Sequence, residues 1–326
     1  MPKVSVIVPS YNYAAYIGEC MESILNQRGF SDLELIVVDD ASSDASREVI
    51  AGFRDPRVVF LEHETNQGHI RTINDGFRRA TGEYVVHVGS DDYWHPEFLA
   101  RTVPVLDAHP EVGLVHTNYV LVDGEGRVGA ERGTNIPFSG DFKGDQLPWI
   151  LFENYLPPAG TLFRREGLEL VGGAFSEDLP YSEDWRLWLA IARRYECYFL
   201  DEPLVYYRVH DRNLHTGALR SRRGEEVEVR ILDEFFADDA LPARIRELRP
   251  RAYATQYRRY ADSYFGFGMA GDCRRCLRAA VRHAPGTMLK PEFWKRYVAA
   301  SVPRGVYRGI QSAYRKGLAL FSPGVL

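Results

Sequence analysis

The sequence predicts an α/β protein whose mostly parallel, Rossmann-like sheet is flanked by helices. Over residues 1–90, short continuous apolar runs alternate with helix-like segments, a pattern typical of sheets that are covered on both faces. Beyond about residue 216, strand patterns end and the sequence becomes helical and rich in arginine. We therefore expect a sheet domain over residues 1–215 and a helical C-terminal region over residues 216–326.

The parallel strands are predicted from apolar runs, and the helices from the segments between them. The strands are expected at 4–8, 33–38, 57–61 and 83–88, and the helices at 14–27, 44–53 and 69–80. Ser42-Ser43-Asp44 marks a helix start, and Gly82 marks a helix end. In such sheets ligands bind beyond the carboxyl ends of the strands, so the residues that directly follow each run form the candidate site.

Antiparallel strands are expected as an addition at one edge of this sheet. The segment 115–128 (VHTNYVLVDGEGRV) is typical of a hairpin, and GTLFRR at 160–165 is typical of a short strand. A clear helix pattern follows at about 183–194. Two strand-like pieces come next, CYFLD at 197–201 and LVYYRV at 204–209, and they end at His210.

Composition and charge limit the class of protein. A formal net charge of -5 argues against a surface built to follow nucleic acid phosphates. No apolar run reaches the roughly 18 residues of a membrane span, and the N-terminus lacks a signal-peptide pattern, so we expect a cytoplasmic protein. The four cysteines are too few for a disulfide framework, and Cys273 and Cys276, spaced like half of a zinc or redox site, are expected on a helix face.

Small polar and aromatic residues follow the first predicted strand, and acidic residues follow the second. Pro9-Ser10-Tyr11-Asn12 places an aromatic ring where a nucleobase can stack, and Asp40 offers a carboxylate that can accept the imide N–H of uracil or thymine. A purely structural interpretation is that Asp40 begins an Asx-type turn and that Tyr11 covers the sheet edge. These residues alone do not decide between the two interpretations.

A second acidic pair follows the fourth predicted strand, in Gly89-Ser90-Asp91-Asp92. Adjacent carboxylates at a ligand-binding edge repel each other unless they share a cation. Oxygen ligands together with a diphosphate suit Mg²⁺ or Mn²⁺, which holds the phosphates and neutralises the charge on a leaving group. The alternative is a loop turn with two solvated acids.

Four motifs occur together and in order in this chain. They are VSVIVPSYN at 4–12, IVVDDASSD at 36–44, NQGHIRTINDGFRRATGEYVVHVGSDD at 66–92 and YSEDWRLWL at 181–189. Each is weak by itself, whereas four in register are specific, and over roughly residues 1–212 the chain resembles the family 2 glycosyltransferases. The resemblance implies the GT-A fold and transfer of a sugar, with inversion at the anomeric carbon, from a nucleotide diphosphate donor.

The resemblance also implies which residues bind the nucleotide. The family pattern makes Pro9, Tyr11 and Asp40 part of the nucleoside pocket, with Asp39 as a neighbour. Many relatives carry an arginine directly before the asparagine of the third predicted helix, where this sequence has isoleucine. Arg71, two positions earlier, is the candidate for the same contact with phosphate or sugar.

A metal site and a catalytic base are implied in the same way. Asp91 and Asp92 match the acidic metal and ribose motif, with Asp92 as the direct ligand of Mn²⁺ or Mg²⁺. His210 is a candidate third ligand or diphosphate donor, with a surface or hydrogen-bonded histidine as the alternative. Asp184 matches the later acidic motif and is the implied base for the acceptor hydroxyl. Its structural alternative is ordinary acidity at a helix N-terminus.

We therefore expect an inverting, metal-dependent glycosyltransferase that moves a hexosyl or deoxyhexosyl group to an acceptor hydroxyl. Asp40 favours a UDP or dTDP donor, and synthesis of cell-surface polysaccharide or glycolipid is the expected setting. The alternative is a catalytically inactive partner protein that binds a nucleotide sugar or a glycan. Asp184 argues against it, because binding alone needs no base.

The tail at 290–316 combines aromatic residues with seven basic residues and one acid. Such a segment suits peripheral contact with an anionic membrane surface, close to a lipid-linked acceptor. A helix that packs on the protein and keeps a solvated basic face is the alternative. The helical region also offers an apolar surface for a homodimer, and no nucleic acid partner is expected.

Overall fold

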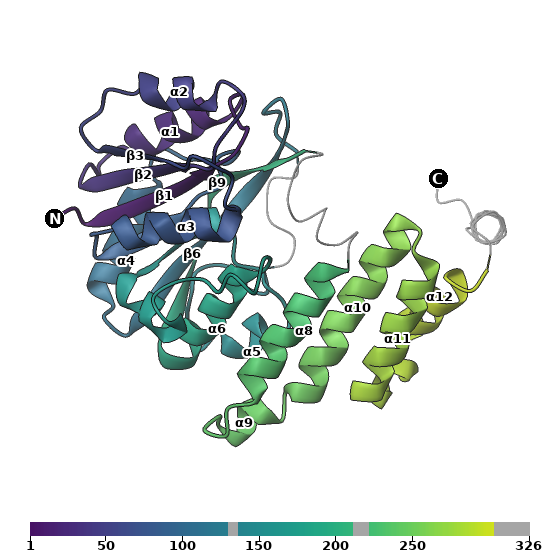
Figure 1. Ribbon diagram of the computed structural model, residues 1–326. Coiled ribbons are helices and arrows are strands. Elements are labelled where there is room, and N and C mark those ends of the chain that lie inside the picture. Colours follow the sequence, from purple (N-terminus) through teal and green to yellow (C-terminus); the bar gives the residue numbers. More distant parts are fainter. Residues whose placement is uncertain (130–135, 211–221, 303–326) are drawn as a thin grey trace, which may run out of the picture. The chain divides into compact units, whose positions relative to one another are not determined.

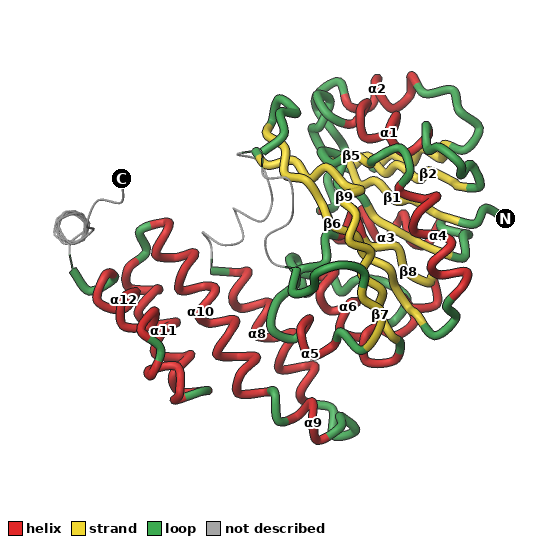
Figure 2. Tube along the Cα trace, turned by 180° about the vertical axis from the view of Figure 1, so that it is seen from behind, coloured by secondary structure: helices red, strands yellow, loops and turns green. Residues whose placement is uncertain are grey.

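The computed structural model describes residues 1–129, 136–210 and 222–302. The chain divides into two compact units, Met1–Leu214 and His215–Leu326. The first unit is a sheet with helices on both faces, and the described part of the second unit is helical, as Figure 1 and Figure 2 show. The α/β fold class predicted from the sequence is confirmed.

One mixed sheet runs through the first unit. In sheet order its strands are β3 (Val58–Glu62), β2 (Leu33–Asp39), β1 (Val4–Ser10), β4 (Tyr84–His87), β8 (Thr161–Arg164), β6 (Val112–Asp123), β9 (Glu196–Val209) and β5 (Tyr93–Trp94), and β7 (Phe142–Gly144) pairs with β9. The first four strands are parallel to one another, and β8 is antiparallel to β4 and β6. β6 and β9 pair in parallel, and β5 and β7 run antiparallel to β9.

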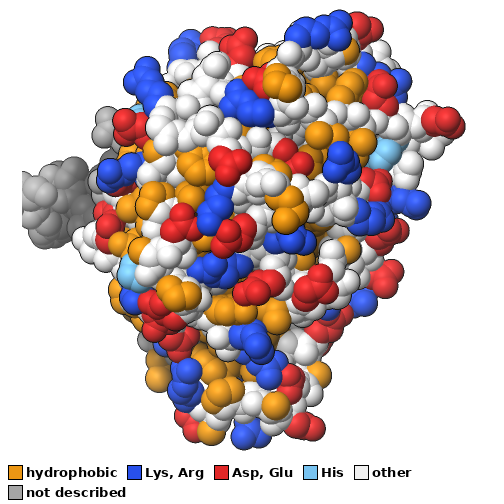
Figure 3. Space-filling model, turned by 90° about the vertical axis from the view of Figure 1, so that its left-hand side faces the viewer, with side chains coloured by type: hydrophobic (Ala, Val, Ile, Leu, Met, Phe, Trp, Pro, Cys, Tyr) orange, Lys and Arg blue, Asp and Glu red, His pale blue; other side chains and the backbone are white. Residues whose placement is uncertain are grey.

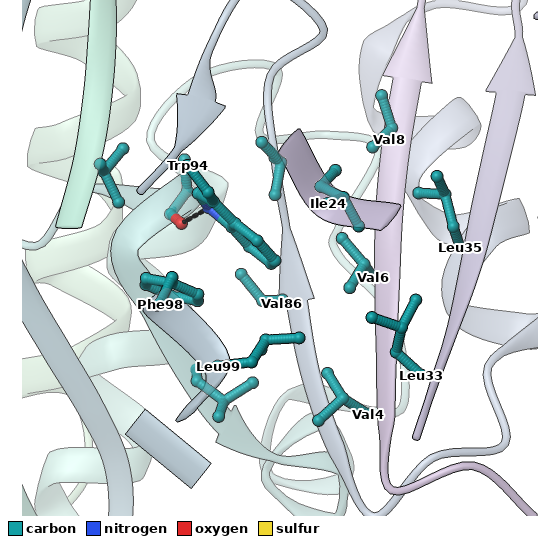
Figure 4. Close-up of a cluster of buried hydrophobic side chains, with 14 of the residues drawn as sticks. Val4, Val6, Val8, Ile24, Leu33, Leu35, Val86, Trp94, Phe98 and Leu99 are labelled. Carbon is teal, nitrogen blue, oxygen red and sulfur yellow. Dashed lines mark hydrogen bonds between the residues drawn. The ribbon is translucent and has the colours of Figure 1, made fainter. Parts of the chain in front are cut away.

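Helices cover both faces of this sheet because the buried strands are apolar on both sides. The helices are α1 (Ile17–Leu25), α2 (Ser46–Gly52), α3 (His69–Arg79), α4 (Phe98–Ala108), α5 (Leu147–Ile150) and α6 (Glu183–Arg194), with two 3-10 turns, η1 (Pro158–Gly160) and η2 (Arg165–Val171). On one face, Val4, Val6 and Val8 of β1 pack with side chains of α1 and α4 (Figure 4). In this cluster, Trp94 donates its indole N–H to the carbonyl of Ala159 at 2.7 Å.

On the opposite face, α3 lies close against β1. A Cβ atom at Gly76 would lie 2.4 Å from Cγ2 of Ile7, so the approach depends on glycine. The side-chain amide of Asn74 donates to the carbonyl of Phe175 at 2.9 Å and accepts the backbone N–H of the same residue at 2.8 Å. These contacts fix α3 and thereby the position of its first residue, His69, beyond the end of β3.

Two predicted strand patterns differ from the structure. The expected hairpin at 115–128 is the long strand β6, and in the described part of the loop its return arm is reduced to a bridge between Val122 and Val128. The pieces expected at 197–201 and 204–209 form one strand, β9, whose pairing with β6 shifts register where Pro203 lies opposite Asn118. Proline lacks the N–H that a regular ladder needs, which explains the shift.

The described part of the second unit contains α8 (Arg223–Phe236), α9 (Ala243–Arg246), α10 (Arg249–Phe267), α11 (Ala270–His283), a 3-10 turn η3 (Pro285–Leu289) and α12 (Pro291–Ala299). Cys273 and Cys276 lie on α11 and pack in one buried cluster with Tyr260 and Tyr264 of α10. The two cysteines therefore lie on one helix, as the sequence predicted, and contribute to its packing.

Surface charge is mixed on the face of the molecule that Figure 3 shows. Lysine and arginine side chains alternate there with aspartate and glutamate, and hydrophobic side chains lie in small groups between them. Within residues 1–129, 136–210 and 222–302, no helix is long and apolar enough to cross a membrane.

Candidate functional site

The candidate site lies where β1, β2 and β4 end. Ser10, the last residue of β1, pairs in register with Asp39, the last residue of β2, so the segments that follow these strands begin side by side. Asn12 has a left-handed backbone with φ 58, and its side-chain oxygen accepts the backbone N–H of Ser43 at 2.8 Å. The segments after β1 and β2 are therefore tied to each other.

Asp39 is engaged within the turn after β2. Its carboxylate is fully buried and accepts the backbone N–H of Ser42 at 2.8 Å, the hydroxyl of Ser42 at 2.5 Å and Nε–H of Arg47 at 2.9 Å. Three donors satisfy a carboxylate that has no exposed surface. The contacts of Asp39 close the turn, and its place in a nucleoside pocket stays a prediction.

Asp40 holds the loop that follows β3. Its two oxygens accept the backbone N–H groups of Gln67 and Gly68 at 2.7 and 2.8 Å, and its Oδ1 lies 2.8 Å from Nδ1 of His63. Nε2 of His63 lies 2.8 Å from Oδ2 of Asp75 on α3. Burial raises the pKa of Asp40, but these hydrogen bonds outweigh burial, and the pKa lies below its usual value. Asp40 is therefore an ionised hydrogen-bond acceptor with capacity left on Oδ2.

The other residues predicted to bind nucleotide differ in exposure. Pro9 is buried within β1, whereas the Tyr11 side chain is 45% exposed and leaves a ring face open for stacking. Arg71 is exposed on α3 and Ile73 is fully buried. Residues two apart on a helix point about 200° away from each other, so Arg71 does not occupy the place of the side chain at 73. Its contact with phosphate or sugar stays a prediction.

The acidic pair after β4 contains a buried carboxylate, that of Asp92. Asp92 is 6% exposed, and its Oδ1 accepts the backbone N–H of Arg208 at 2.9 Å. Burial and then the charge of Asp91 raise the pKa of Asp92 well above its usual value, although Arg208 acts in the opposite direction. An additional positive charge beside Asp92 would favour its ionised form.

The structure brings His210 next to Asp91. Nε2 of His210 lies 3.0 Å from Oδ2 of Asp91. The imidazole stacks on the ring of Tyr16, with 5.4 Å between centroids, and lies 5.8 Å from the ring of Tyr13. Two residues that were assigned to one site from separate motifs are thus neighbours, and their contact joins the loop after β4 to the end of β9.

Arg208 links this acidic pair to α1. Its side chain is 2% exposed and forms an ion pair with Glu19. The guanidinium donates to the carbonyl of Asp91 at 2.9 Å and to the carbonyl of Asp123 at 3.2 Å. It also lies over the ring of Tyr16, 4.7 Å from the centroid, a favourable cation–π geometry. Arg208 thus supplies a buried positive charge behind the two aspartates.

The acidic pair has the types of ligand atom that a divalent cation prefers, but it offers too few ligands to hold the cation alone. Asp91, Asp92 and His210 offer the oxygen and nitrogen atoms that Mn²⁺ accepts. Burial and then the charge of Asp91 raise the pKa of Asp92, and a bound cation would oppose both effects. Among the described residues, no three His, Cys, Asp or Glu side chains gather closely enough to hold a metal ion. A cation here would therefore need oxygens from a substrate, as Mg²⁺ at phosphate sites does.

Asp184 lies in the first turn of α6 and is 7% exposed. The side-chain amide of Asn154 donates to both of its oxygens, at 3.2 and 3.1 Å, and the backbone N–H of Trp185 donates to Oδ1 at 2.8 Å. The helix N-terminus adds a favourable dipole. These contacts hold a carboxylate in a defined orientation, as a general base requires.

His69, at the start of α3, adjoins Glu183, the residue before Asp184. Nε2 of His69 lies 3.4 Å from Oε1 of Glu183. Burial lowers the pKa of His69, but the contact with Glu183 and the charges of Asp184 and Asp91 raise it above its usual value. Burial raises the pKa of Glu183, but the hydrogen bond and charge of His69, a backbone hydrogen bond and the charge of His87 together lower it below its usual value. The acidic residues after β4 and at the start of α6 therefore both favour the protonated form of His69.

Four side chains of this site were not predicted from the sequence: His63, His69, Asn154 and Arg208. His69 stands inside a quoted motif, and Arg208 stands two residues before His210, so both could have been considered. His63 and Asn154 stand outside the quoted motifs, and their roles depend on partners that become neighbours through folding.

Comparison with known proteins gives consistent matches. The sequence profile of Glycosyl transferase family 2 matches residues 5–171. An uncharacterized glycosyltransferase of Nostoc sp. is 33% identical over 260 residues, which cover 74% of this chain and 78% of that protein. The uncharacterized glycosyltransferase EpsJ of Bacillus subtilis is 29% identical over 290 residues, which cover 87% of this chain and 76% of that protein.

Solved structures show a similar fold. TarS 1–349 of S. aureus, in complex with UDP-GlcNAc, has a TM-score of 0.66 at 22% identity and covers 97% of this chain and 92% of its own. The mannosyltransferase PcManGT from Pyrobaculum calidifontis, in complex with GDP-Man and Mn²⁺, has a TM-score of 0.60 at 22% identity, with 97% and 88% covered. At this level of identity the likeness concerns the fold.

Proposed function

Because the chain belongs to glycosyltransferase family 2, we propose that it is an inverting transferase that moves a sugar from a UDP- or dTDP-linked donor to an acceptor hydroxyl. The observation that carries this proposal is the different environment of three carboxylates beyond the strands. Asp40 has a lowered pKa, Asp92 has a raised pKa, and Asp184 is held by three N–H hydrogen bonds. In this proposal Asp40 accepts the N–H of the nucleobase, Asp92 binds the cation, and Asp184 accepts the proton of the acceptor hydroxyl.

Donor recognition is proposed for the edge formed by β1 and β2. The exposed ring of Tyr11 offers a stacking surface, and Oδ2 of Asp40 can accept the imide N–H of uracil or thymine. The complexes of similar folds with UDP-GlcNAc and GDP-Man support a nucleotide sugar as the ligand class. Asp40 is the reason to favour UDP or dTDP.

In the proposed reaction, Asp184 accepts the proton of the acceptor hydroxyl, and the acceptor oxygen attacks the anomeric carbon. The bond between that carbon and the diphosphate oxygen breaks, and the diphosphate leaves with the electron pair on the opposite face. Asp92, with Asp91 and His210, would hold a Mn²⁺ or Mg²⁺ ion, whose bound form neutralises charge on the leaving diphosphate. Configuration at the anomeric carbon is inverted in a single displacement.

The test is calorimetric titration of UDP, dTDP, GDP and CMP with Mn²⁺ and then with EDTA. We expect UDP or dTDP to bind in a metal-dependent manner. Asp184→Asn should bind the nucleotide as wild type does and lose transfer by roughly 10²–10⁴-fold, the contribution of a general base. Asp32→Asn, an exposed aspartate before β2, is the matched control. Wild-type transfer by Asp184→Asn would remove this residue from the role of base.

The inactive-partner alternative makes a different prediction in the same assays. A scaffold would bind a nucleotide or glycan, yet the wild-type protein would neither transfer the sugar nor release UDP from UDP-GlcNAc with water as acceptor. Metal-dependent UDP release that Asp184→Asn loses would exclude this alternative.

We also propose peripheral contact with an anionic membrane through α12 and the turn before it, which would bring the site to a lipid-linked acceptor of polysaccharide or glycolipid synthesis. Leu289 is 86% exposed and Trp294 is 47% exposed, and Lys290 and Lys295 are exposed beside them. Phe293, in contrast, is buried against α10 and α11. One face of this helix therefore packs and the other offers apolar and basic groups, as interfacial binding needs.

Vesicle sedimentation tests the membrane contact. Binding to phosphatidylglycerol vesicles should exceed binding to phosphatidylcholine vesicles, and Leu289→Ser with Trp294→Ser should reduce it at least tenfold. Val128→Ser, at an exposed valine of the first unit, is the control. Equal sedimentation of the double variant and wild type would contradict the proposal.

A homodimer through the second unit is a separate proposal, and light scattering of the same samples tests it.

A further inference from the structure

We propose that Asn154 is a positioning residue, which holds Asp184 ionised and in one orientation for proton transfer. The proposal rests on the proposed role of Asp184 as base. Asn154 lies between α5 and η1, 30 residues before its partner, and it stands outside the acidic motifs that the family resemblance supplies.

The contact geometry supports this role. Nδ2 of Asn154 lies 3.2 Å from Oδ1 and 3.1 Å from Oδ2 of Asp184, so one N–H of the amide is shared between both oxygens of one carboxylate. The backbone N–H of Trp185 donates to Oδ1 at 2.8 Å. Hydrogen bonds to the charged form of an acid favour that form, and donors on two sides restrict rotation of the carboxylate.

The segment that carries Asn154 is fixed by its own packing. Trp185 is fully buried, and its indole N–H donates to the carbonyl of Ile150 at 2.7 Å. On the other side of Asn154, the hydroxyl of Tyr155 donates to Oε1 of Gln146 at 3.0 Å. The loop is therefore attached both to α6 and to the start of α5. A side chain on such a loop can position its partner to within a fraction of an ångström.

The orientation of the amide depends on the charge of Asp184. Oδ1 of Asn154 is buried and has no hydrogen-bond partner among the described residues, so this oxygen does not determine which way the amide faces. A flipped amide would place its oxygen against an ionised carboxylate. The observed orientation therefore favours ionised Asp184, because an N–H donates a stronger hydrogen bond to a charged carboxylate than to a neutral one.

The other titratable groups that face Asp184 do not replace Asn154. Glu183 precedes it on α6 and would repel its charge, but His69 of α3 contacts Glu183 at 3.4 Å and offsets that charge. Tyr207 of β9 has a pKa raised by burial and by Asp92, Asp91 and Asp184, so it is neutral. Within the part of the chain that the structure describes, the amide of Asn154 is a side-chain donor in contact with both oxygens.

The test measures the titration of Asp184 directly, because this measurement needs no acceptor. Protein labelled with ¹³C at the aspartate carboxyl carbons is titrated by NMR, and Asp184→Asn identifies the signal. Asn154→Ala should raise the pKa of Asp184 by about one unit, since hydrogen bonds to the charged form are lost. Asn154→Asp, which keeps the shape of the side chain, should raise it further because two carboxylates then share the site.

Asn118→Ala is the matched control, because Nδ2 of Asn118 also donates to an aspartate, Asp201, at 3.1 Å. It should leave the titration of Asp184 unchanged. An unchanged pKa of Asp184 in both Asn154 variants would overturn the proposal, even if nucleotide binding and UDP release by the wild type supported the proposed function. Failure of nucleotide binding in the wild type would instead count against the proposed function and leave the titration result standing.

The kinetic counterpart uses release of UDP from UDP-GlcNAc with water as acceptor. For Asn154→Ala and Asn154→Asp, kcat at neutral pH should fall and its acidic limb should move to higher pH by the same shift that NMR shows. KM for the donor should remain within about twofold, because Asp40 and Asp92 are untouched. A fall in kcat with an unshifted acidic limb would indicate a merely structural role and would contradict the proposal.

Discussion

Two Asp-Asp pairs lie beyond neighbouring parts of the same sheet, one after β2 and one after β4. Asp39 and Asp40 accept hydrogen bonds from the Ser42 backbone and hydroxyl, from Arg47 and from the loop at 67–68, and the pKa of Asp40 is lowered. Asp92, in contrast, accepts the backbone N–H of Arg208, and its pKa is raised. The second aspartate of the same dipeptide thus has a lowered pKa after β2 and a raised pKa after β4.

The difference follows from how many donors among the described residues reach Asp39 and Asp40, and how many reach Asp92. A carboxylate that accepts several N–H groups organises loops and needs no further charge. A buried carboxylate with one donor and an acidic neighbour is incomplete without a cation. An acidic pair in a sequence is therefore ambiguous, and the local supply of donors decides whether it serves the fold or a metal ion.

The largest expected effect is on nucleotide binding. Asp92→Asn should weaken binding of UDP with Mn²⁺ by about 100-fold and leave the weak binding in EDTA unchanged. Asp40→Asn should weaken binding by a similar factor in Mn²⁺ and in EDTA, because its proposed contact is with the nucleobase. Calorimetry under both conditions separates the two patterns. If Asp40→Asn weakened UDP binding only in Mn²⁺, the proposed difference between the two acidic pairs would be wrong.

The second largest expected effect is on the free energy of unfolding, which should respond differently to substitutions in the two pairs. Asp39→Asn should lower it by about 2 kcal/mol, since hydrogen bonds to a buried charged group are lost. Asp92→Asn should leave it equal to or above that of the wild type in EDTA, because a neutral amide carries a smaller desolvation penalty than an ionised carboxylate. Urea denaturation at pH 7 measures both changes. Equal destabilisation by the two substitutions would show that Asp92 is satisfied as Asp39 is.

Much of the fold that surrounds these pairs is predictable from the sequence. The runs at 4–8 and 33–38 are apolar at every position or nearly so, and such runs form buried parallel strands. The acidic pairs follow these runs directly, so their position at the carboxyl edge follows from topology. Whether a pair is satisfied depends on donors such as Gln67 and Arg208, which reach it through turns and distant strands, and no local pattern reports that.

Dependence of stability on pH should have opposite signs for the two pairs. The pKa of Asp40 is lowered in the folded state, so its contribution is present above the unfolded pKa of about 3.9 and is lost as pH falls through the lower folded pKa. The pKa of Asp92 is raised, so its ionisation destabilises the fold above that pKa. This cost shrinks as pH falls below the folded pKa and is gone below the unfolded pKa of about 3.9.

The measurement is urea denaturation in EDTA at a series of pH values from 7 to 3. The destabilisation by Asp40→Asn, about 1–2 kcal/mol at pH 7, should vanish toward the acidic end. Any stabilisation by Asp92→Asn should likewise be largest at pH 7. Differences of the same sign for both variants would refute the electrostatic contrast.

The smallest expected effect concerns His63, which stands between Asp40 and Asp75 with 2.8 Å on each side. His63→Gln should weaken UDP binding by about threefold, because one of several contacts of Asp40 is lost while the Gln67 and Gly68 N–H groups remain. His109→Gln, at a half-exposed histidine after α4, is the control. Calorimetric titration at pH 7 measures the change, and a loss as large as that of Asp40→Asn would mean that His63 itself contacts the nucleotide.

The residues that sequence reasoning missed share a physical property. Asn154 contacts Asp184, and Arg208 pairs with Glu19, which is 189 residues away. Periodicity and motif spacing describe neighbours along the chain, whereas these contacts arise when α6 and β9 pack beside earlier elements. His69 is different, because it lies in the NQGH segment of a recognised motif, so the sequence did contain a signal for it.

The contacts of Arg208 and His210 with the loop after β4 also set an order of events during synthesis. The network around Asp39 and Asp40 uses residues up to Asp75 and can form while the rest of the chain is still being made. The backbone N–H of Arg208 reaches Asp92 across 116 positions, and His210 reaches Asp91 across 119. A nascent chain that stalls before β9 would carry the contacts of Asp39 and Asp40 without those that Arg208 and His210 make with Asp92 and Asp91. The two acidic pairs would therefore gain these partners at different times.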